Sequence, residues 1–180
     1  NYIPSLIYQV KTKELKTDLG IYFSNDFKSS KKEAQMIGGI VKAKSYPDPS
    51  FDRIKETINQ HNAIHIVTHQ KNGKIKFKDR DISLDNFIDL IPRNLKFIIC
   101  NFCSSFISED LDNKYPINNK SVSQKMMAKN VKIVITHNWE LGQNASYFLS
   151  ENFYSKKRIL ENMKEFKPSE YGGYIIWGNN

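Results

Sequence analysis

The fold is decided by two apolar stretches, Ala63-Ile64-His65-Ile66-Val67-Thr68-His69 and Lys96-Phe97-Ile98-Ile99-Cys100-Asn101-Phe102-Cys103-Ser104-Ser105. Both are rich in β-branched and aromatic residues and are too short for helices, so we interpret them as buried strands. Between them lie a charged, glycine-containing segment (71–83) and a helix-like segment (84–91). This order of strand, crossover and strand predicts that the two strands pair in parallel. Their carboxyl ends then lie at the same edge of the sheet.

A histidine and a cysteine stand at those two carboxyl ends. His69 ends the first strand and Cys103 the second. Together they form the smallest set that gives a thiolate nucleophile with a general base. His65 lies inside its strand and is interpreted as a satisfied core group, and Cys100 as a small buried hydrophobic residue. A purely structural role for His69 and Cys103 stays open.

The remaining chain alternates between strand and helix patterns, which predicts an α/β domain. Further strands are expected over residues 19–24, 40–46, 131–137 and 174–177, and a short edge strand over 6–10. Helices are expected from Ser29 or Ser30 to Gly38-Gly39, from Ser50 through Ile58, over 84–91 after Ser83, from Ser121 or Ser123 to Ala128, and over 144–153 and 158–166. Residues 74–82 alternate like a short hairpin, and the long polar stretch 104–120 is typical of a functional loop.

Length and composition favour one globular domain spanning residues 1–180. The chain is 39% hydrophobic and 26% charged, and no apolar stretch approaches the ~20 residues of a membrane span. Two cysteines provide no disulfide framework, which favours a reducing, cytoplasmic setting. The chain begins at Asn1 rather than Met, so we expect a segment excised from a longer multidomain chain.

The formal net charge of +8 raises the question of nucleic-acid binding. Lysines occur in several separate predicted surface segments and fit no nucleic-acid-binding motif, which favours a solvated lysine-rich surface. A basic nucleic-acid-binding domain remains an alternative function.

The spacing of histidines and cysteines also invites a metal or redox interpretation. His65 and His69 are four residues apart, which in a strand is ~13 Å, too far for one zinc ion. Cys100 and Cys103 face opposite sides of a regular strand. A redox Cys-x-x-Cys normally stands at a helix start, whereas Cys100 lies within an apolar strand. We therefore expect no metal, although the sequence alone leaves both alternatives open.

These residues resemble the CHAT proteases, a bacterial branch of the caspase–separase group. The similarity rests on Ile64-His65-Ile66-Val67-Thr68-His69, on the strand ending Asn101-Phe102-Cys103-Ser104-Ser105, and on Val131-Lys132-Ile133-Val134-Ile135-Thr136-His137-Asn138-Trp139. It continues through the helix from Asn144-Ala145-Ser146 to Phe153-Tyr154 and the closing strand within 173–178. It covers roughly residues 19–180, and the order and spacing of the motifs carry it.

The resemblance implies a caspase-like three-layer sandwich with a mainly parallel sheet flanked by helices. It assigns the base to His69 and the nucleophile to Cys103, with the backbone N–H groups of Gln70 and Cys103 as the oxyanion hole. Gln70 stands where family members usually have glycine. Asn101 and Trp139 are the implied substrate-binding residues. Basic-specific relatives have aspartate at the position of Asn101, so we expect a preference for an uncharged or polar substrate side chain. The alternative is that the loop 104–120 brings an acid, Glu109, Asp110 or Asp112, into the pocket.

The function that follows is a cysteine endopeptidase acting on a protein substrate with a Cys-His dyad. This chemistry needs no cofactor. The resemblance further implies activation by a regulatory domain or partner protein, in systems that include bacterial defence. The alternative from another class is a catalytically silent caspase-like interaction module.

Overall fold

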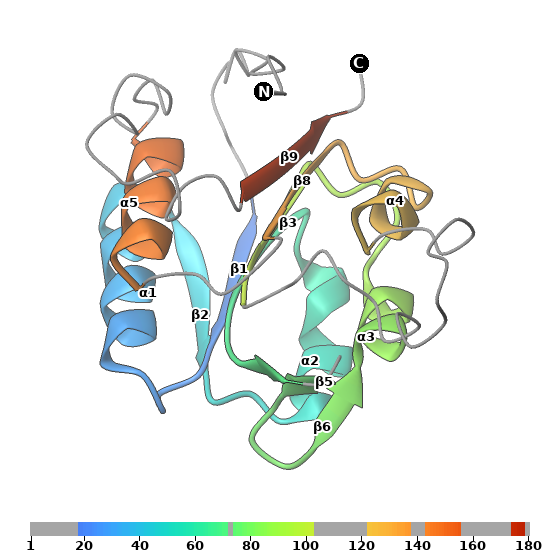
Figure 1. Cartoon of the computed structure of the whole chain (residues 1–180), viewed down its shortest axis with the longest axis horizontal. Helices are drawn as coiled ribbons and strands as arrows, with labels where there is room; N and C mark the ends of the chain where they lie inside the picture. The colour runs from blue at the N-terminus through green and yellow to red at the C-terminus, as the bar shows by residue number, and fades with distance from the viewer. Residues whose placement is uncertain (1–17, 72–73, 103–121, 138–142, 156–173, 179–180) are drawn as a thin grey trace, which may run out of the picture.

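The computed structural model describes residues 18–71, 74–102, 122–137, 143–155 and 174–178, and a six-stranded sheet runs through its centre (Figure 1). The strand order is β2-β1-β3-β7-β8-β9. The first five strands are parallel and β9 is antiparallel to β8. This arrangement confirms the α/β class and the mainly parallel sheet. The strands are β1 (Leu19–Phe23), β2 (Ala43–Pro47), β3 (Ala63–Val67), β7 (Phe97–Asn101), β8 (Ile133–His137) and β9 (Tyr174–Gly178).

The two apolar stretches form neighbouring strands at the middle of this sheet. β3 and β7 pair in parallel, and their register places Ala63 opposite Phe97 and Val67 opposite Asn101. Every residue of both strands is buried, as continuous β-branched and aromatic stretches in a parallel sheet predict. The expected parallel pair is therefore confirmed, and its two carboxyl ends lie level.

Helices cover both faces of the sheet (Figure 1). On one face α1 (Lys28–Ile40) lies beside α5 (Gln143–Tyr154), and on the other are α2 (Phe51–Thr57), α3 (Leu84–Leu90) and α4 (Val122–Met127). A single 3₁₀ turn (Ile58–Gln60) extends α2. Because successive strand residues point to opposite faces, Ile64 and Ile66 join the core under α2–α4, whereas Ala63 and Val67 join the core under α1 and α5.

A small three-stranded antiparallel sheet follows His69 directly. Its strands are β4 (Gln70–Lys71), β5 (Lys74–Lys76) and β6 (Asp81–Ser83), in the order β4-β5-β6. The hairpin expected over 74–82 is confirmed, with β4 as an added strand.

Two of the expected helix starts are confirmed and one is wrong. The hydroxyls of Ser50 and Ser83 accept hydrogen bonds from the backbone N–H three residues on, capping α2 and α3. Helix α1 instead begins after Phe27, with no side-chain cap, and runs through Gly38-Gly39 to Ile40. The strand expected from residue 40 consequently begins at Ala43. Both glycines are exposed and helical, so the packing of the opposite face carries the helix past them.

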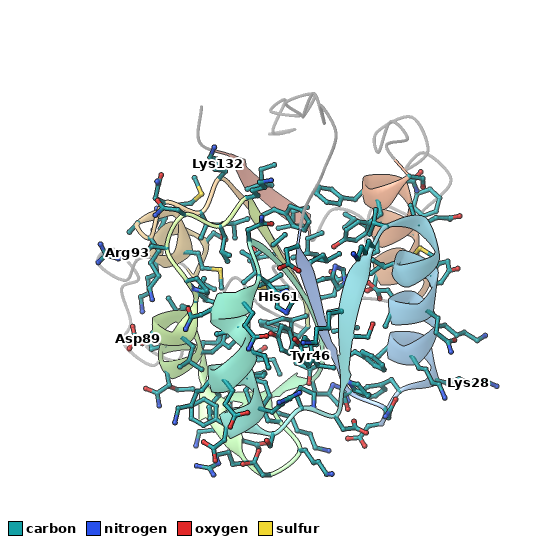
Figure 2. The ribbon with its side chains drawn as sticks, turned by 180° about the vertical axis from the view of Figure 1, so that it is seen from behind. Lys28, Tyr46, His61, Asp89, Arg93 and Lys132 are labelled. Carbon is teal, nitrogen blue, oxygen red and sulfur yellow. The ribbon has the colours of Figure 1, made fainter. Side chains whose placement is uncertain are left out.

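The edge of the sheet at β2 is held by a chain of polar groups that runs from the buried Tyr46 and His61 to the exposed Asp18. The Tyr46 hydroxyl lies 2.9 Å from Nε2 of His61, and Nδ1 of His61 lies 3.1 Å from a carboxylate oxygen of Asp18. Figure 2 shows Tyr46 and His61 in the interior. A Cβ atom added at Gly20 would lie 2.5 Å from the His61 ring, so this close approach requires glycine.

Charged side chains lie around the outside of the molecule and come from separate elements, as Lys28, Asp89, Arg93 and Lys132 do in Figure 2. None of the helices in the described ranges is long and apolar enough to cross a membrane. The strand expected over 6–10, the helix over 158–166 and the loop 104–120 lie outside the described residues.

Candidate active site at the end of strands β3 and β7

His69 stands just beyond the carboxyl end of β3, between the main sheet and β4. Its ring is perpendicular to the ring of Phe27, with the ring centres 3.8 Å apart. Partial burial lowers the pKa of His69, the positive charge of Lys76 lowers it further, and Asp26 opposes both effects. The imidazole is therefore held neutral around pH 7, the form in which it accepts a proton.

A hollow of about 120 Å³ lies between His69 and the end of β7. Asn101 and Phe102 line it from β7 and the residue after it, Glu33 from α1 and Ser146 from α5. Val67 and Phe27 complete its apolar walls. Its volume is several times what one water molecule needs, so it has room for the end of a side chain.

Two sequence-predicted site residues cannot be compared with this geometry. Cys103 follows Phe102 in the chain and lies outside the described residues, as does Trp139. The structure brings His69 to the same hollow as Asn101 and Phe102, the two residues before Cys103.

Gln70 occupies an ordinary backbone conformation. It belongs to β4 and pairs with Ile75 of β5. Within the described ranges, the non-glycine residues with positive φ are Asp48, Asn94 and Asn130. Gln70 is not among them, so this position does not need a glycine conformation.

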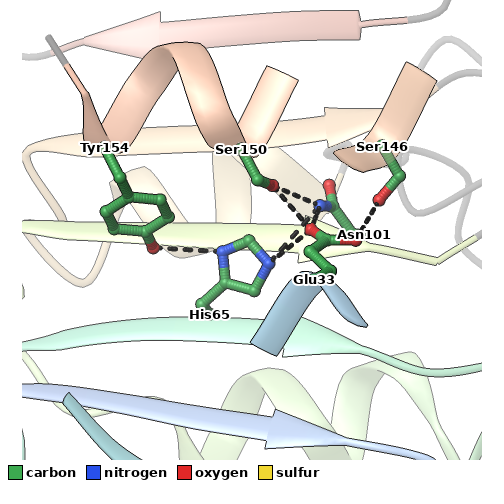
Figure 3. Close-up of polar contacts among 6 residues, drawn as sticks. All are labelled: Glu33, His65, Asn101, Ser146, Ser150 and Tyr154. Carbon is green, nitrogen blue, oxygen red and sulfur yellow. Dashed lines mark hydrogen bonds and ion pairs between the residues drawn. The ribbon is translucent and has the colours of Figure 1, made fainter. Parts of the chain in front are cut away.

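A buried carboxylate is the main site feature that the sequence analysis missed. Glu33 of α1 is about 1% exposed. Its Oε1 accepts hydrogen bonds from Nδ2 of Asn101 at 2.6 Å and from the Ser150 hydroxyl at 2.5 Å, and lies 3.0 Å from Nε2 of His65. Its Oε2 accepts one from the Ser146 hydroxyl at 2.7 Å. Figure 3 shows these side chains converging from α1, β3, β7 and α5.

The network continues through His65 to Tyr154 of α5. Nδ1 of His65 lies 3.0 Å from the Tyr154 hydroxyl, and both side chains are buried. The prediction that His65 is a satisfied core group is therefore confirmed. Because α1, β3, β7 and α5 each contribute to one polar cluster, the network fixes how these four elements sit against each other.

The surroundings favour the charged form of Glu33 and the neutral form of Tyr154. Burial alone would raise the pKa of Glu33, but the contacts with His65, Ser150 and Ser146 together hold it below its usual range. Burial, and to a lesser degree the charge of Glu33, raises the pKa of Tyr154 well above its usual value. Glu33 thus acts as an acceptor and Tyr154 keeps its proton.

One signal in the sequence could have located Glu33. In a helix over this segment, Ser30, Glu33, Ala34 and Ile37 share one face, and these are the residues of α1 that are buried. An acid on the apolar face of a helix calls for buried partners. The sequence did not indicate which residues those partners were.

Asn101 was expected to contact substrate. It lines the hollow, but it is only 4% exposed, and its amide also donates to the Ser150 hydroxyl at 3.1 Å. Its side chain is therefore part of the wall that holds Glu33, and its substrate-binding role stays a prediction.

A second hollow of about 230 Å³ lies on the other side of Thr68. Tyr22 and Phe77 line it together with Asp26 and Lys76, whose side chains form an ion pair at 2.6 Å. Thr68 lines both hollows and its hydroxyl donates to the carbonyl of Lys76. Thr68, just after the end of β3, thus borders both hollows, and His69 lines the smaller one.

The other cysteine takes no part in this site. Cys100 is fully buried, and burial raises the pKa of its thiol far above the usual range, so the thiol is inert. The prediction that Cys100 is a buried hydrophobic residue is confirmed. Across the described residues, no group of three or more His, Cys, Asp or Glu side chains could hold a metal ion.

Comparison with known proteins adds no relative: no protein-family model matches the chain, and no curated protein matches its sequence.

Proposed function

We propose that the chain is a caspase-like cysteine endopeptidase in which His69 is the general base and Cys103 the nucleophile. One observation carries the proposal: β3 and β7 are neighbouring parallel strands in a register that ends them level, with Val67 opposite Asn101. His69 follows Val67 by two residues and Cys103 follows Asn101 by two. The ends of parallel strands are where open α/β sheets place their sites.

The electrostatics of His69 support the same role. A neutral imidazole takes the proton of the Cys103 thiol, and the thiolate attacks the carbonyl carbon of the scissile peptide bond. The imidazolium then donates that proton to the leaving nitrogen as the C–N bond breaks. Water hydrolyses the remaining thioester with His69 again as base, which releases the acid and restores the thiol.

Backbone N–H groups of Gln70 and Cys103 are the proposed oxyanion donors. One such donor contributes about 3 kcal/mol to the stability of the transition state. The ordinary backbone of Gln70 is compatible with this assignment. The two hollows that Thr68 borders suit a substrate chain that crosses the end of β3. The caspase-like topology, activation by a regulatory partner and a place in bacterial defence are parts of this proposal that rest on the resemblance.

A peptide-library cleavage assay on the native assembly, the full-length protein together with its regulatory partner, tests the proposal. We expect cleavage by the wild type and by Cys100→Ala, the matched control, and none by Cys103→Ala or His69→Ala. Cleavage that survives Cys103→Ala would contradict the proposed nucleophile. Absence of cleavage by the wild type would contradict the enzyme and favour the silent interaction module.

A further inference from the structure

The buried carboxylate of Glu33 forms part of the wall of the hollow beside His69. Its two oxygens are not equally satisfied. Oε1 has contacts with His65, Asn101 and Ser150, whereas within the described part of the chain Oε2 has a single donor, the Ser146 hydroxyl. A carboxylate oxygen accepts about two hydrogen bonds, so Oε2 retains acceptor capacity.

Most of the donors around Glu33 are neutral. They are the Ser146 and Ser150 hydroxyls and the Asn101 amide, whereas His65 is the one titratable partner. These surroundings hold the buried carboxylate in its charged form, and within the described residues its Oε2 has only the neutral Ser146 donor. An opposite charge that enters the hollow is therefore attracted more strongly than at the surface.

The walls of the hollow suit a cation on an apolar stem. Val67, Phe102 and Phe27 provide apolar surface, and Glu33 and Ser146 provide oxygen atoms. Lysine and arginine side chains have this composition, with an aliphatic stem and a head that only donates hydrogen bonds. The volume of about 120 Å³ excludes anything much larger than one side chain.

We propose that this hollow binds the ammonium or guanidinium group of a basic substrate side chain, with Glu33 as the residue that sets the specificity. The inference rests on the proposed endopeptidase function, in which the side chain belongs to the residue before the scissile bond. It replaces the uncharged pocket expected from Asn101 alone, because the acid comes from α1 rather than from the strand that precedes the nucleophile.

Binding of side-chain mimics tests the charge without requiring catalysis. n-Butylguanidinium is titrated into the native chain while the Asn101 side-chain amide and the His69 ring are followed by NMR, with neutral, nearly isosteric n-butylurea as the control. We expect saturable shifts with guanidinium and binding at least roughly tenfold tighter than that of the urea, as for a hydrogen bond to a buried charge. Equal binding, or no perturbation by either compound, overturns the inference even if no variant folds.

The variant Glu33→Gln keeps the shape of the side chain and removes its charge. We expect it to bind the two mimics within about threefold of each other, as loss of the charged partner requires. A guanidinium preference that persists in Glu33→Gln would assign the cation site to another acid.

Peptides with arginine or its neutral analogue citrulline before the scissile bond separate this inference from the proposed function. Cleavage of both peptides at equal kcat/KM would leave the endopeptidase standing and overturn the role of Glu33. Guanidinium binding that depends on Glu33, with neither peptide cleaved by the full-length protein together with its regulatory partner, would leave the cation site standing and contradict the endopeptidase.

Discussion

Oε1 of Glu33 lies 3.0 Å from Nε2 of His65, and both side chains are removed from solvent in the centre of the molecule. This contact joins α1 to β3, and the other partners of Glu33 extend it to β7 and α5 (Figure 3). The same carboxylate faces the hollow beside His69. Glu33 therefore links the packing of α1 and α5 to the chemistry of the proposed site.

The far end of this network gives a direct stability test. Tyr154→Phe removes the hydroxyl that contacts Nδ1 of His65, and we expect the free energy of unfolding to fall by about 1–2 kcal/mol. Tyr147→Phe is the matched control on the same helix, because Tyr147 is only partly buried and has no hydrogen bond to another described residue. Urea unfolding of both variants measures the difference. Equal decreases in the free energy of unfolding would show that the His65–Tyr154 contact does not stabilise the protein.

Acid sensitivity should reveal the charge of Glu33. Its pKa is below the ordinary value of 4.5 in the folded protein, so the unfolded chain binds the proton more readily. Its contribution to stability is present above pH 4.5 and is lost as the pH falls through the lowered folded pKa. The stability gap between wild type and Glu33→Gln should therefore narrow from pH 6 to pH 3 in denaturant unfolding. A gap that widens in acid would mean that folded Glu33 is protonated.

Two glycine-to-alanine substitutions are expected to change the free energy of unfolding in opposite directions. Gly20→Ala places a Cβ atom 2.5 Å from the ring of His61, and overpacking of this kind costs about 1–3 kcal/mol. Gly38 lies in α1 with no atom within 4 Å of an added Cβ, so Gly38→Ala should stabilise the protein by about 0.5–1 kcal/mol. Thermal and denaturant unfolding report both values. A neutral Gly20→Ala variant would contradict the close packing of β1 against His61.

The pKa of His69 should respond to its two charged neighbours in opposite directions. Lys76 lowers this pKa and Asp26 raises it, so Lys76→Gln should shift it upward and Asp26→Asn downward. NMR titration of the His69 ring measures each shift, with the His61 ring as an internal reference remote from the substitutions. Shifts of the same sign in both variants would contradict the electrostatic account of the base.

The sequence predicted the structure best where residues within one short segment determine the local conformation. The continuous apolar content of residues 63–67 and 97–101 predicted two buried strands, and Ser50 and Ser83 marked helix starts. It was misleading at Gly38-Gly39, because the apolar face of α1 stabilises the helix by more than two exposed glycines weaken it.

The polar network was beyond sequence reasoning for a different reason. The contacts of Glu33 lie between 32 residues away, at His65, and 117 residues away, at Ser150. Nothing local to α1 indicates which of the buried polar side chains will face it once the sheet has formed. The end-of-strand position of His69, by contrast, followed from the strand–crossover–strand order, which fixes the edge of the sheet at which both strands end.

The reactivity of Cys103 tests the central claim most directly. The native chain is alkylated with iodoacetamide across a range of pH, and modification of Cys103 and Cys100 is quantified by peptide mass spectrometry in wild type and His69→Ala. We predict that Cys103 reacts well below the ordinary thiol pKa of about 8.5, that His69→Ala slows its reaction about tenfold at pH 7, and that buried Cys100 stays unmodified. An ordinary thiol profile for Cys103 that is unchanged by His69→Ala would contradict the catalytic pair.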